Sequence, residues 1–333
     1  MEIGRIEHHG PDGPVPRVVV ARNGGPWVDV RAAERLRLER GGASPAAARR
    51  LADVVAPGSL TAALENGEAF LEAAHNALQS GQDQALAPTD ARLLAPLDPP
   101  AYRDFMAFEK HFRTPYERNG TAVPDVLYEL PVSYMGSAQA MLGPDDDIPW
   151  PAYSEKIDFE LELGIVIGRT GRNVTPGTAR EHILGVTVFN DFSARDIQMH
   201  EMSGRLGPSK GKHFASAVGP RIVTLDALDP AALTMIARVN GEEWTRASSG
   251  SILWSIEELV SWASTGEQLV AGTLLGTGTV GGGCGMELQR MLQVGDTIEL
   301  EIEGIGVLRN RITTDPDSGW RPTPRLSAGA TAS

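Results

Sequence analysis

The chain has 333 residues, 41% hydrophobic and 22% charged, which is ordinary for a globular protein with one large and one smaller domain. Its net charge of −13 argues against nucleic acid or an anionic membrane as a partner. The single cysteine, Cys284, excludes an intrachain disulfide and favours a reducing compartment, so we expect a cytoplasmic protein.

The N-terminal part is predicted to mix short strands with helices. β-like runs at 17–21 and 27–30 are separated by Gly/Pro turns. Alanine-rich stretches with apolar residues at helical spacing follow at 44–56 and 69–78. The opening residues lack the basic and apolar regions of a signal peptide.

A proline-rich segment predicts where this part ends. Residues 86–100 contain four prolines and are typical of a linker, so we place a domain boundary near residue 90. We therefore expect a small α/β domain at 1–90, a larger domain at 91–320 and a flexible tail at 321–333.

The stretch 102–113 carries two polar residues of interest, which a helical conformation would bring together. On a helix, Asp104 and His111 share a face, because they are seven residues apart, with phenylalanines packing beside them. The alternative is that His111 is a packing residue beside an apolar stripe. The proline- and glycine-bearing flanks predict that this segment is a mobile lid, with His111 only loosely engaged until the lid closes.

Acidic and apolar residues alternate along 157–168, which is the period of a strand. Asp158, Glu160 and Glu162 should then project from one face, with the intervening apolar side chains entering a core. A capping-box pattern at 178–181 predicts a short helix, and a second strand ends at Asp191. These carboxylates could gather around Mg²⁺, Mn²⁺ or Ca²⁺. The alternative is a strand with one solvated acidic face.

The rest of the chain is predicted to consist mainly of strands. A helix is expected at 255–264, and Asn240-Gly241 is a hairpin signal. The basic loop 207–214 lacks phosphate-loop spacing. The uncharged run 268–286 is too glycine-rich to span a membrane. We read Cys284 as a bystander rather than a nucleophile. The strands expected beyond residue 150 are at 157–168, 185–191, 221–225, 234–240, 297–303 and 306–312, and a further strand begins the run 274–288 before it becomes a glycine-rich loop.

Six ordered motifs resemble the fumarylacetoacetate hydrolase family over roughly residues 102–312. They are DFMAFEKH, PVSYMG, DFELELG, NDFSARDIQ, GPSKGKHF and LLGTGTVGGGCGMEL, the last followed by GDTIELEIEGIGVLRN. The resemblance implies an α+β, β-rich fold, in which a C-terminal mixed β-roll follows a small N-terminal α/β domain. It also implies a homodimer that binds Mg²⁺, or Ca²⁺ or Mn²⁺, on carboxylates.

The family's functional residues carry over onto particular positions of this chain. Matched to motif positions, the implied metal ligands are Glu160, Glu162, Asp191 and Asp104. The implied general base is His111, oriented by Glu287, with Lys212 and Gln198 facing the reacting centre. The implied substrate contacts are Tyr134 and Thr279, together with Met106 and Met202, which stand where fumarylacetoacetate hydrolase has tyrosines.

The resemblance implies hydrolysis of a carbon–carbon bond in a 1,3-dicarbonyl compound, of fumarylacetoacetate or acylpyruvate type, by water that His111 activates. Its alternatives are a 2-oxo acid decarboxylase, isomerase or hydratase on the same scaffold, or a non-catalytic metal-stabilised binding protein. Met106 and Met202 predict a more apolar distal pocket, unless they only fill gaps in packing. Arg113, Arg118 and Arg205 are candidates for holding a distal carboxylate.

Overall fold

The computed structural model describes residues 1–10, 13–79, 85–88, 90–316 and 319–325. Its architecture is the strand-rich mixture of strands and helices that the sequence predicts, built from mixed sheets. Among these residues, the main sheet follows the strand order β3-β2-β1-β14-β12-β10-β18-β5-β6, with β4 beside β1 and β7 beside β14. Its strands are β1 (Glu2–Gly10), β2 (Gly13–Ala21), β3 (Val28–Asp29), β4 (Leu93–Leu94), β5 (Tyr102–Phe105), β6 (Ser133–Met135), β7 (Met141–Leu142), β10 (Leu161–Ile167), β12 (Ile183–Asn190), β14 (Ser216–Thr224) and β18 (Leu274–Gly276).

A second sheet packs against the middle of the first and has the order β16-β15-β19-β20-β8. Apolar side chains of β10, β12 and β14 meet those of β15, β19 and β20 in one buried core. Asn240 and Gly241 have φ of 52° and 80° and form the predicted hairpin between β15 and β16. The strands are β8 (Asp147–Trp150), β15 (Thr234–Val239), β16 (Glu242–Ser248), β19 (Thr297–Ile302) and β20 (Gly306–Thr314). Two small pairs join β9 (Ile157–Asp158) to β13 (Ser193–Ala194) and β11 (Gly171–Arg172) to β17 (Gln268–Leu269).

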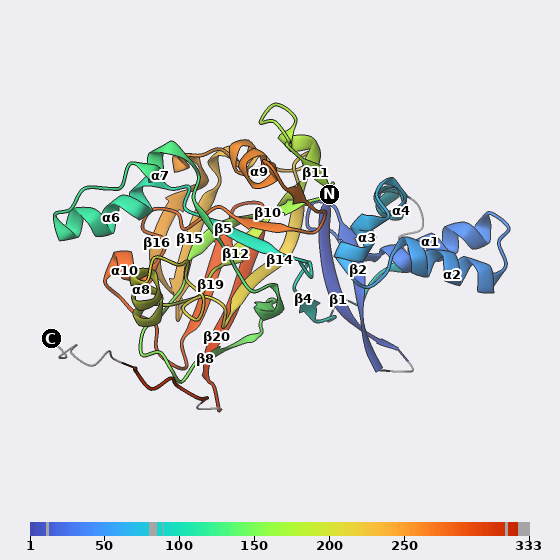
Figure 1. Cartoon of the computed structure of the whole chain (residues 1–333). Helices are drawn as coiled ribbons and strands as arrows, with labels where there is room; N and C mark the ends of the chain where they lie inside the picture. The colour runs from blue at the N-terminus through green and yellow to red at the C-terminus, as the bar shows by residue number, and fades with distance from the viewer. Residues whose placement is uncertain (11–12, 80–84, 89, 317–318, 326–333) are drawn as a thin grey trace.

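The helices lie in two groups, as Figure 1 shows. Helices α1 to α4 gather beside β1 and β2 at one side of the molecule, while α6, α8 and α10 lie at the other. The helices are α1 (Val30–Arg40), α2 (Pro45–Val55), α3 (Leu60–Glu65), α4 (Glu68–Gln79), α6 (Glu109–Asn119), α7 (Val126–Glu129), α8 (Arg195–Ser203), α9 (Ile256–Ser264) and α10 (Gly285–Leu288). Short 3₁₀ turns are η1 (Ala138–Ala140), η2 (Ala179–His182), η3 (Pro230–Ala232) and η4 (Ser249–Ser251).

The N-terminal part shares both a sheet and a core with the rest of the chain. Strand β1 pairs antiparallel with β14, where Ile3 lies opposite Ile222. Ile3 also belongs to the same buried cluster as Phe70 and Leu274. The domain boundaries stay a prediction. Of the predicted tail, residues 321–325 are exposed without helix or strand, and 326–333 lie outside the described residues.

Two local interpretations from the sequence agree with the structure only in part: 102–113 is helical only from Glu109, and a short 3₁₀ helix, η2, does begin after Thr178. The stretch 102–113, considered above as a helix, is strand β5, then a short connection, and helix α6 only from Glu109 onward. Pairing of β5 with β18 outweighs the helical spacing, because it buries Tyr102 and Phe105 in the sheet. The capping box at Thr178 does not form, since η2 has no side-chain cap hydrogen bond. A capping box does form at α9, between Ser255 and Glu258.

Candidate active site

Four carboxylates converge at the ends of four neighbouring strands. Strand β12 runs antiparallel to β10, β10 antiparallel to β18, and β18 parallel to β5, so the relevant ends meet at one edge of the sheet. Asp104 lies near the end of β5, opposite Gly276 of β18. Glu160 directly precedes β10, Glu162 is its second residue, and Asp191 directly follows β12. One oxygen from each of the four carboxylates lies within 4.8 Å of the others.

The acidic face of β10 is buried rather than solvated. Leu161 and Leu163 enter the core between the two sheets, as the alternation predicts. Glu160 and Glu162 project from the opposite face but are 3% and 0% exposed. The alternative of a strand with a solvated acidic face is therefore excluded.

Glycines at the end of β18 allow the carboxylates to approach. A Cβ on Gly276 would lie 2.5 Å from Asp104 Oδ1 and 2.8 Å from Glu162 Oε2, closer than atoms can pack. Gly278, at a φ of 84°, donates its N–H to the same two oxygens at 3.2 and 3.0 Å. The backbone thus forms the floor of the cluster, which only glycine permits at these positions.

Lys212 enters the cluster and contacts two of its carboxylates, and the pKa values of the carboxylates are shifted in opposite directions. Lys212 Nζ contacts Glu160 Oε2 at 2.6 Å and Asp191 Oδ2 at 2.7 Å. Burial acts to raise the pKa of Glu160, but Lys212 and Arg195 outweigh it and hold that pKa at about 2. Burial, followed by repulsion between carboxylates, raises the pKa values of Asp104 and Glu162 well above their ordinary range.

A cation fits this arrangement of charges. Counting the adjacent Asp158, five buried carboxylates face two buried side-chain cations, Lys212 and Arg195. Buried negative charge in excess is costly unless it is protonated or paired, and four converging oxygens are the donors that hard divalent ions prefer. The cluster of Asp104, Glu160, Glu162 and Asp191 could therefore bind a metal ion.

The predicted base and its orienting carboxylate are in contact. His111 Nδ1 lies 2.8 Å from Glu287 Oε2, although the two residues are 176 positions apart in the chain. The glycine-rich segment that carries Glu287 passes beside the cluster, where Cys284 forms a β-bridge with Glu160. The expectation that His111 is only loosely engaged is wrong.

Helix α6 is held in place at both of its ends. Phe108 and Phe112 are buried beneath it, which fixes its first turns. Arg118, near its last turn, donates to the carbonyl oxygens of Met286 (3.0 Å) and Glu287. The helix that carries His111 is thus joined directly to the turn that carries Glu287.

Sequence reasoning missed the roles of Asp158 and Arg195. Asp158 is fully buried and accepts from the backbone N–H groups of Gly285 (2.7 Å) and Met286 (2.9 Å), at the start of the turn that carries Glu287. It also accepts from Arg195 Nε at 2.9 Å, while Arg195 Nη1 lies 2.8 Å from Glu160 Oε1. Asp158 was visible as the first acid of the alternation, but no local pattern assigned it this partner.

The predicted polar contacts surround the cluster. Tyr134 Oη donates to Asp191 Oδ2, and Thr279 Oγ1 lies 3.4 Å from Glu162 Oε1. Gln198 does not touch the carboxylates; its Oε1 accepts from Arg195 Nη1 at 3.1 Å.

The predicted apolar contacts differ in burial. Met106 is half-buried directly after β5, and its backbone approaches Gly278. Met202 is 42% exposed on α8. Of the candidate arginines, Arg113 pairs with acids on its own helix, and Arg205 is exposed.

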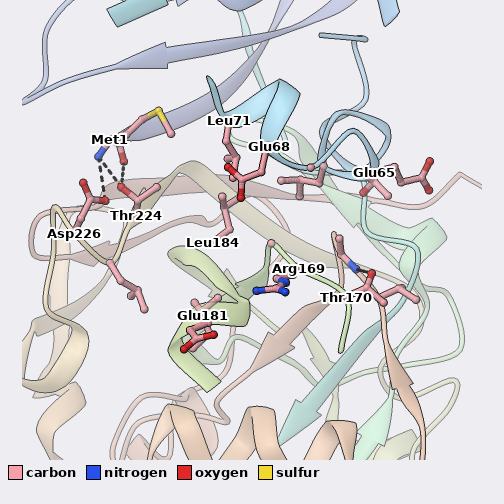
Figure 2. A pocket seen from close by; sticks show the side chains of 18 of the residues that line it. Met1, Glu65, Glu68, Leu71, Arg169, Thr170, Glu181, Leu184, Thr224 and Asp226 are labelled. Carbon is pink, nitrogen blue, oxygen red and sulfur yellow. Dashed lines mark hydrogen bonds and ion pairs between the residues drawn. The ribbon is translucent and has the colours of Figure 1, made fainter. Parts of the chain in front are cut away.

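A separate cavity lies between the N-terminal helices and strand ends of the main sheet. It measures about 950 Å³. Figure 2 shows Glu68 and Leu71 on one side of it, with Arg169 and Glu181 on the other. Its walls contain none of the four clustered carboxylates, so this cavity is separate from the candidate active site.

The fold and the site agree with what comparison with known proteins finds. The family model for the fumarylacetoacetate (FAA) hydrolase C-terminal domain matches residues 101–313. The chain belongs to the fumarylacetoacetate hydrolase family.

Its relatives in sequence include mitochondrial oxaloacetate tautomerases. The chain is 34% identical to FAHD2A of Bos taurus over 264 residues, covering 77% of this chain and 80% of that protein. It is 30% identical to FAHD2A of Homo sapiens over 262 residues, covering 78% and 81%. Since these relatives are named as mitochondrial, the cytoplasmic location stays a prediction. Among the described residues, no helix has the length and apolar character needed to cross a membrane.

Solved structures with the same fold include a hydrolase and an isomerase. A fumarylacetoacetate hydrolase from Exiguobacterium antarcticum has a TM-score of 0.67 at 28% identity, covering 95% of this chain and all of that one. A 5-carboxymethyl-2-hydroxymuconate delta-isomerase from Mycobacterium smegmatis has a TM-score of 0.64 at 26% identity, with the same coverage. Family members are enzymes that differ in the reaction they carry out.

Proposed function

We propose that this protein is a divalent-metal-dependent hydrolase that cleaves a carbon–carbon bond in an acylpyruvate-like 1,3-dicarbonyl substrate. The observation that carries the proposal is the contact between His111 and Glu287 beside a buried cluster of four carboxylates. A histidine that is oriented by a carboxylate is a general base, and the carboxylate cluster is a site for a Lewis-acidic cation. Activated water is what distinguishes hydrolysis from decarboxylation, which needs a site that stabilises negative charge but no attacking water.

We propose Mg²⁺ as the cofactor, with Ca²⁺ or Mn²⁺ as alternatives, held by Asp104, Glu160, Glu162 and Asp191. The donor set contains only oxygens, which suits these ions better than zinc. When bound, the cation supplies stabilisation of the negative charge that develops on the dicarbonyl oxygens.

His111 would take a proton from the attacking water through Nε2. Its Nδ1–H would donate to Glu287, which fixes the tautomer and stabilises the imidazolium as it forms. Gly282 N–H donates to the other oxygen of Glu287 at 3.0 Å and holds the carboxylate in place. The proton taken by His111 can then be returned to the carbon that leaves.

Lys212 and Gln198 would meet the oxyanion of the tetrahedral intermediate. Two contacts of Lys212 Nζ go to Glu160 and Asp191, so one of its three N–H groups is available to substrate. Because Arg195 contacts the Gln198 oxygen, the amide nitrogen is free to donate. Preorganised donors of this kind are commonly worth about 3 kcal/mol each.

The remaining contacts would set substrate choice. Tyr134 and Thr279 would bind the polar end of the substrate near the carboxylates, and Met106 and Met202 would face an apolar acyl group. The products would be a carboxylic acid and a ketone or 2-oxo acid. Assembly as a homodimer stays a prediction, which sedimentation of the purified protein tests.

Incubation with an acylpyruvate and Mg²⁺ tests the function directly, by following loss of the enol absorbance and identifying the products. His111→Ala should lower kcat by roughly 10²–10⁴-fold with metal content retained. His75→Ala is the matched control, because His75 is an exposed helical histidine on α4. Normal turnover with lower stability in His111→Ala would make His111 a packing residue and remove the base from the mechanism.

A tautomerase or isomerase acting on a 2-oxo acid is the second candidate. It is supported by the oxaloacetate tautomerases among the relatives and the delta-isomerase among the similar structures. The same His111 could move a proton between carbon and oxygen without activating water. Keto–enol interconversion of oxaloacetate, with no acid released from acylpyruvates, would favour this candidate. A decarboxylase would release CO₂ in the same panel, a hydratase would add water without cleavage, and a binding protein would leave every substrate unchanged.

A further inference from the structure

We propose that His111, Cys284 and Glu287 form a second metal site, which takes a thiophilic divalent cation such as Zn²⁺ or Cd²⁺. One ligand atom from each of the three side chains lies within 4.8 Å of the others. Glu287 Oε2 is their common neighbour, 2.8 Å from His111 Nδ1 and 3.3 Å from Cys284 Sγ. The three residues come from α6 and from the glycine-rich segment that leads into α10.

The chemistry of these donors separates this site from the carboxylate cluster. Nitrogen, sulfur and oxygen donors are those of zinc, whereas the cluster offers oxygen alone. Zinc–ligand distances of about 2.0–2.3 Å in a tetrahedron require ligand atoms roughly 3.3–3.7 Å apart. The two observed contacts therefore need to lengthen by about 0.5 Å or less, which the adjoining glycines 281–283 can accommodate.

A small cavity adjoins the proposed site. It measures about 150 Å³ and is lined by Glu287 and Met286 of α10 and by residues of α6 that include Arg118. The His111 side chain is 12% exposed, whereas that of Glu287 is 3% exposed and Cys284 is fully buried. Of the three ligands, Glu287 lines this cavity, so a cation that enters it would reach Glu287 first. The fourth coordination position can keep a water.

Binding exchanges one proton for the cation. The Cys284 thiol loses its proton to solvent, and the cation is held by this thiolate, the Glu287 carboxylate and the neutral imidazole of His111. The two negative ligands then neutralise the divalent charge.

The consequence for catalysis rests on the proposed function. A metal on His111 Nδ1 places the ring proton on Nε2, the nitrogen that we propose activates water. The base is then lost while the carboxylate cluster stays intact. Zn²⁺ should therefore inhibit the Mg²⁺-loaded enzyme by lowering kcat, and excess Mg²⁺ should not reverse the inhibition.

Titration of the Mg²⁺-saturated protein with Cd²⁺ tests the site without reference to activity. Thiolate bound to Cd²⁺ absorbs in the ultraviolet, and Cys284 is the chain's only cysteine, so any such band reports this residue. We expect one equivalent to produce the band with release of one proton. The band should vanish in Cys284→Ser, and Cd²⁺ affinity should fall at least tenfold in His111→Gln.

Three results would overturn the site: no thiolate band in the native protein, a band with unchanged affinity in His111→Gln, or competition by Mg²⁺. The melting temperature of Cys284→Ser checks that its loss of the band is not unfolding. Inhibition is measured for each variant against its own activity without Cd²⁺. A band with the expected ligand dependence but no inhibition would support the site and contradict the proposed role of His111 Nε2.

Discussion

Asp158 on β9 accepts hydrogen bonds both from Arg195 and from the turn that carries Glu287. Replacing Asp158 by Asn removes part of these contacts. Both oxygens of Asp158 accept: Oδ1 from the N–H groups of Phe159 and Gly285, and Oδ2 from Met286 and Arg195. An amide keeps one oxygen, so whichever way it points, two buried donors face an NH₂ group. Breaking a buried pair of this kind costs about 3–5 kcal/mol.

This cost translates into a measurable shift of thermal unfolding. An unfolding entropy of roughly 2.1 cal/mol/K per residue gives about 0.7 kcal/mol/K for 333 residues. The midpoint of Asp158→Asn should therefore fall by about 4–7 °C. The value of kcat should also fall, because one of the two N–H groups that tie the Glu287 turn to residue 158, that of Gly285 or that of Met286, loses its acceptor.

Asp145→Asn is the matched control for this variant. Asp145 pairs with Arg309 at 2.7 Å, but both side chains are more than half exposed, and such pairs contribute about 1 kcal/mol or less. Asn also tolerates the φ of 62° at this position. Melting curves followed by circular dichroism give both midpoints. A shift in Asp158→Asn no larger than in the control would refute the anchoring role of Asp158.

Three further predictions concern the carboxylate cluster and the pocket. Glu162→Gln should lower metal affinity and activity together, measured by metal analysis and turnover; unchanged values in both would remove Glu162 from the ligand set. Gly276→Ala should push Asp104 and Glu162 apart and weaken metal binding by roughly 10–100-fold, measured by calorimetry, and wild-type affinity would contradict the close approach seen at this glycine. Met202→Tyr should shift kcat/KM towards substrates with a distal polar group, whereas a flat response across an alkyl-to-carboxylate series would make Met202 a packing residue.

The sequence predicts those features of the site that depend on local backbone geometry. The alternation along 157–168 predicts correctly that Glu160 and Glu162 share a face opposite Leu161 and Leu163, because successive side chains of a strand point to opposite sides. The same local reading failed at 102–113, where helical spacing lost to pairing between β5 and β18. Asp104 nevertheless reaches the cluster, but from a strand.

The sequence does not predict whether the acidic face of β10 is buried or exposed to solvent. Only the tertiary structure determines this. A period-two pattern states which side chains lie together, but both a solvated face and a buried site satisfy it. Burial follows from the strand order β12-β10-β18-β5, which aligns strand ends that are far apart in the chain. The entry of Lys212 into the cluster and the contact of His111 with Glu287 likewise depend on long-range packing. The sequence alone therefore determined the chemical groups and their local faces, and the tertiary structure decided which of them meet away from water.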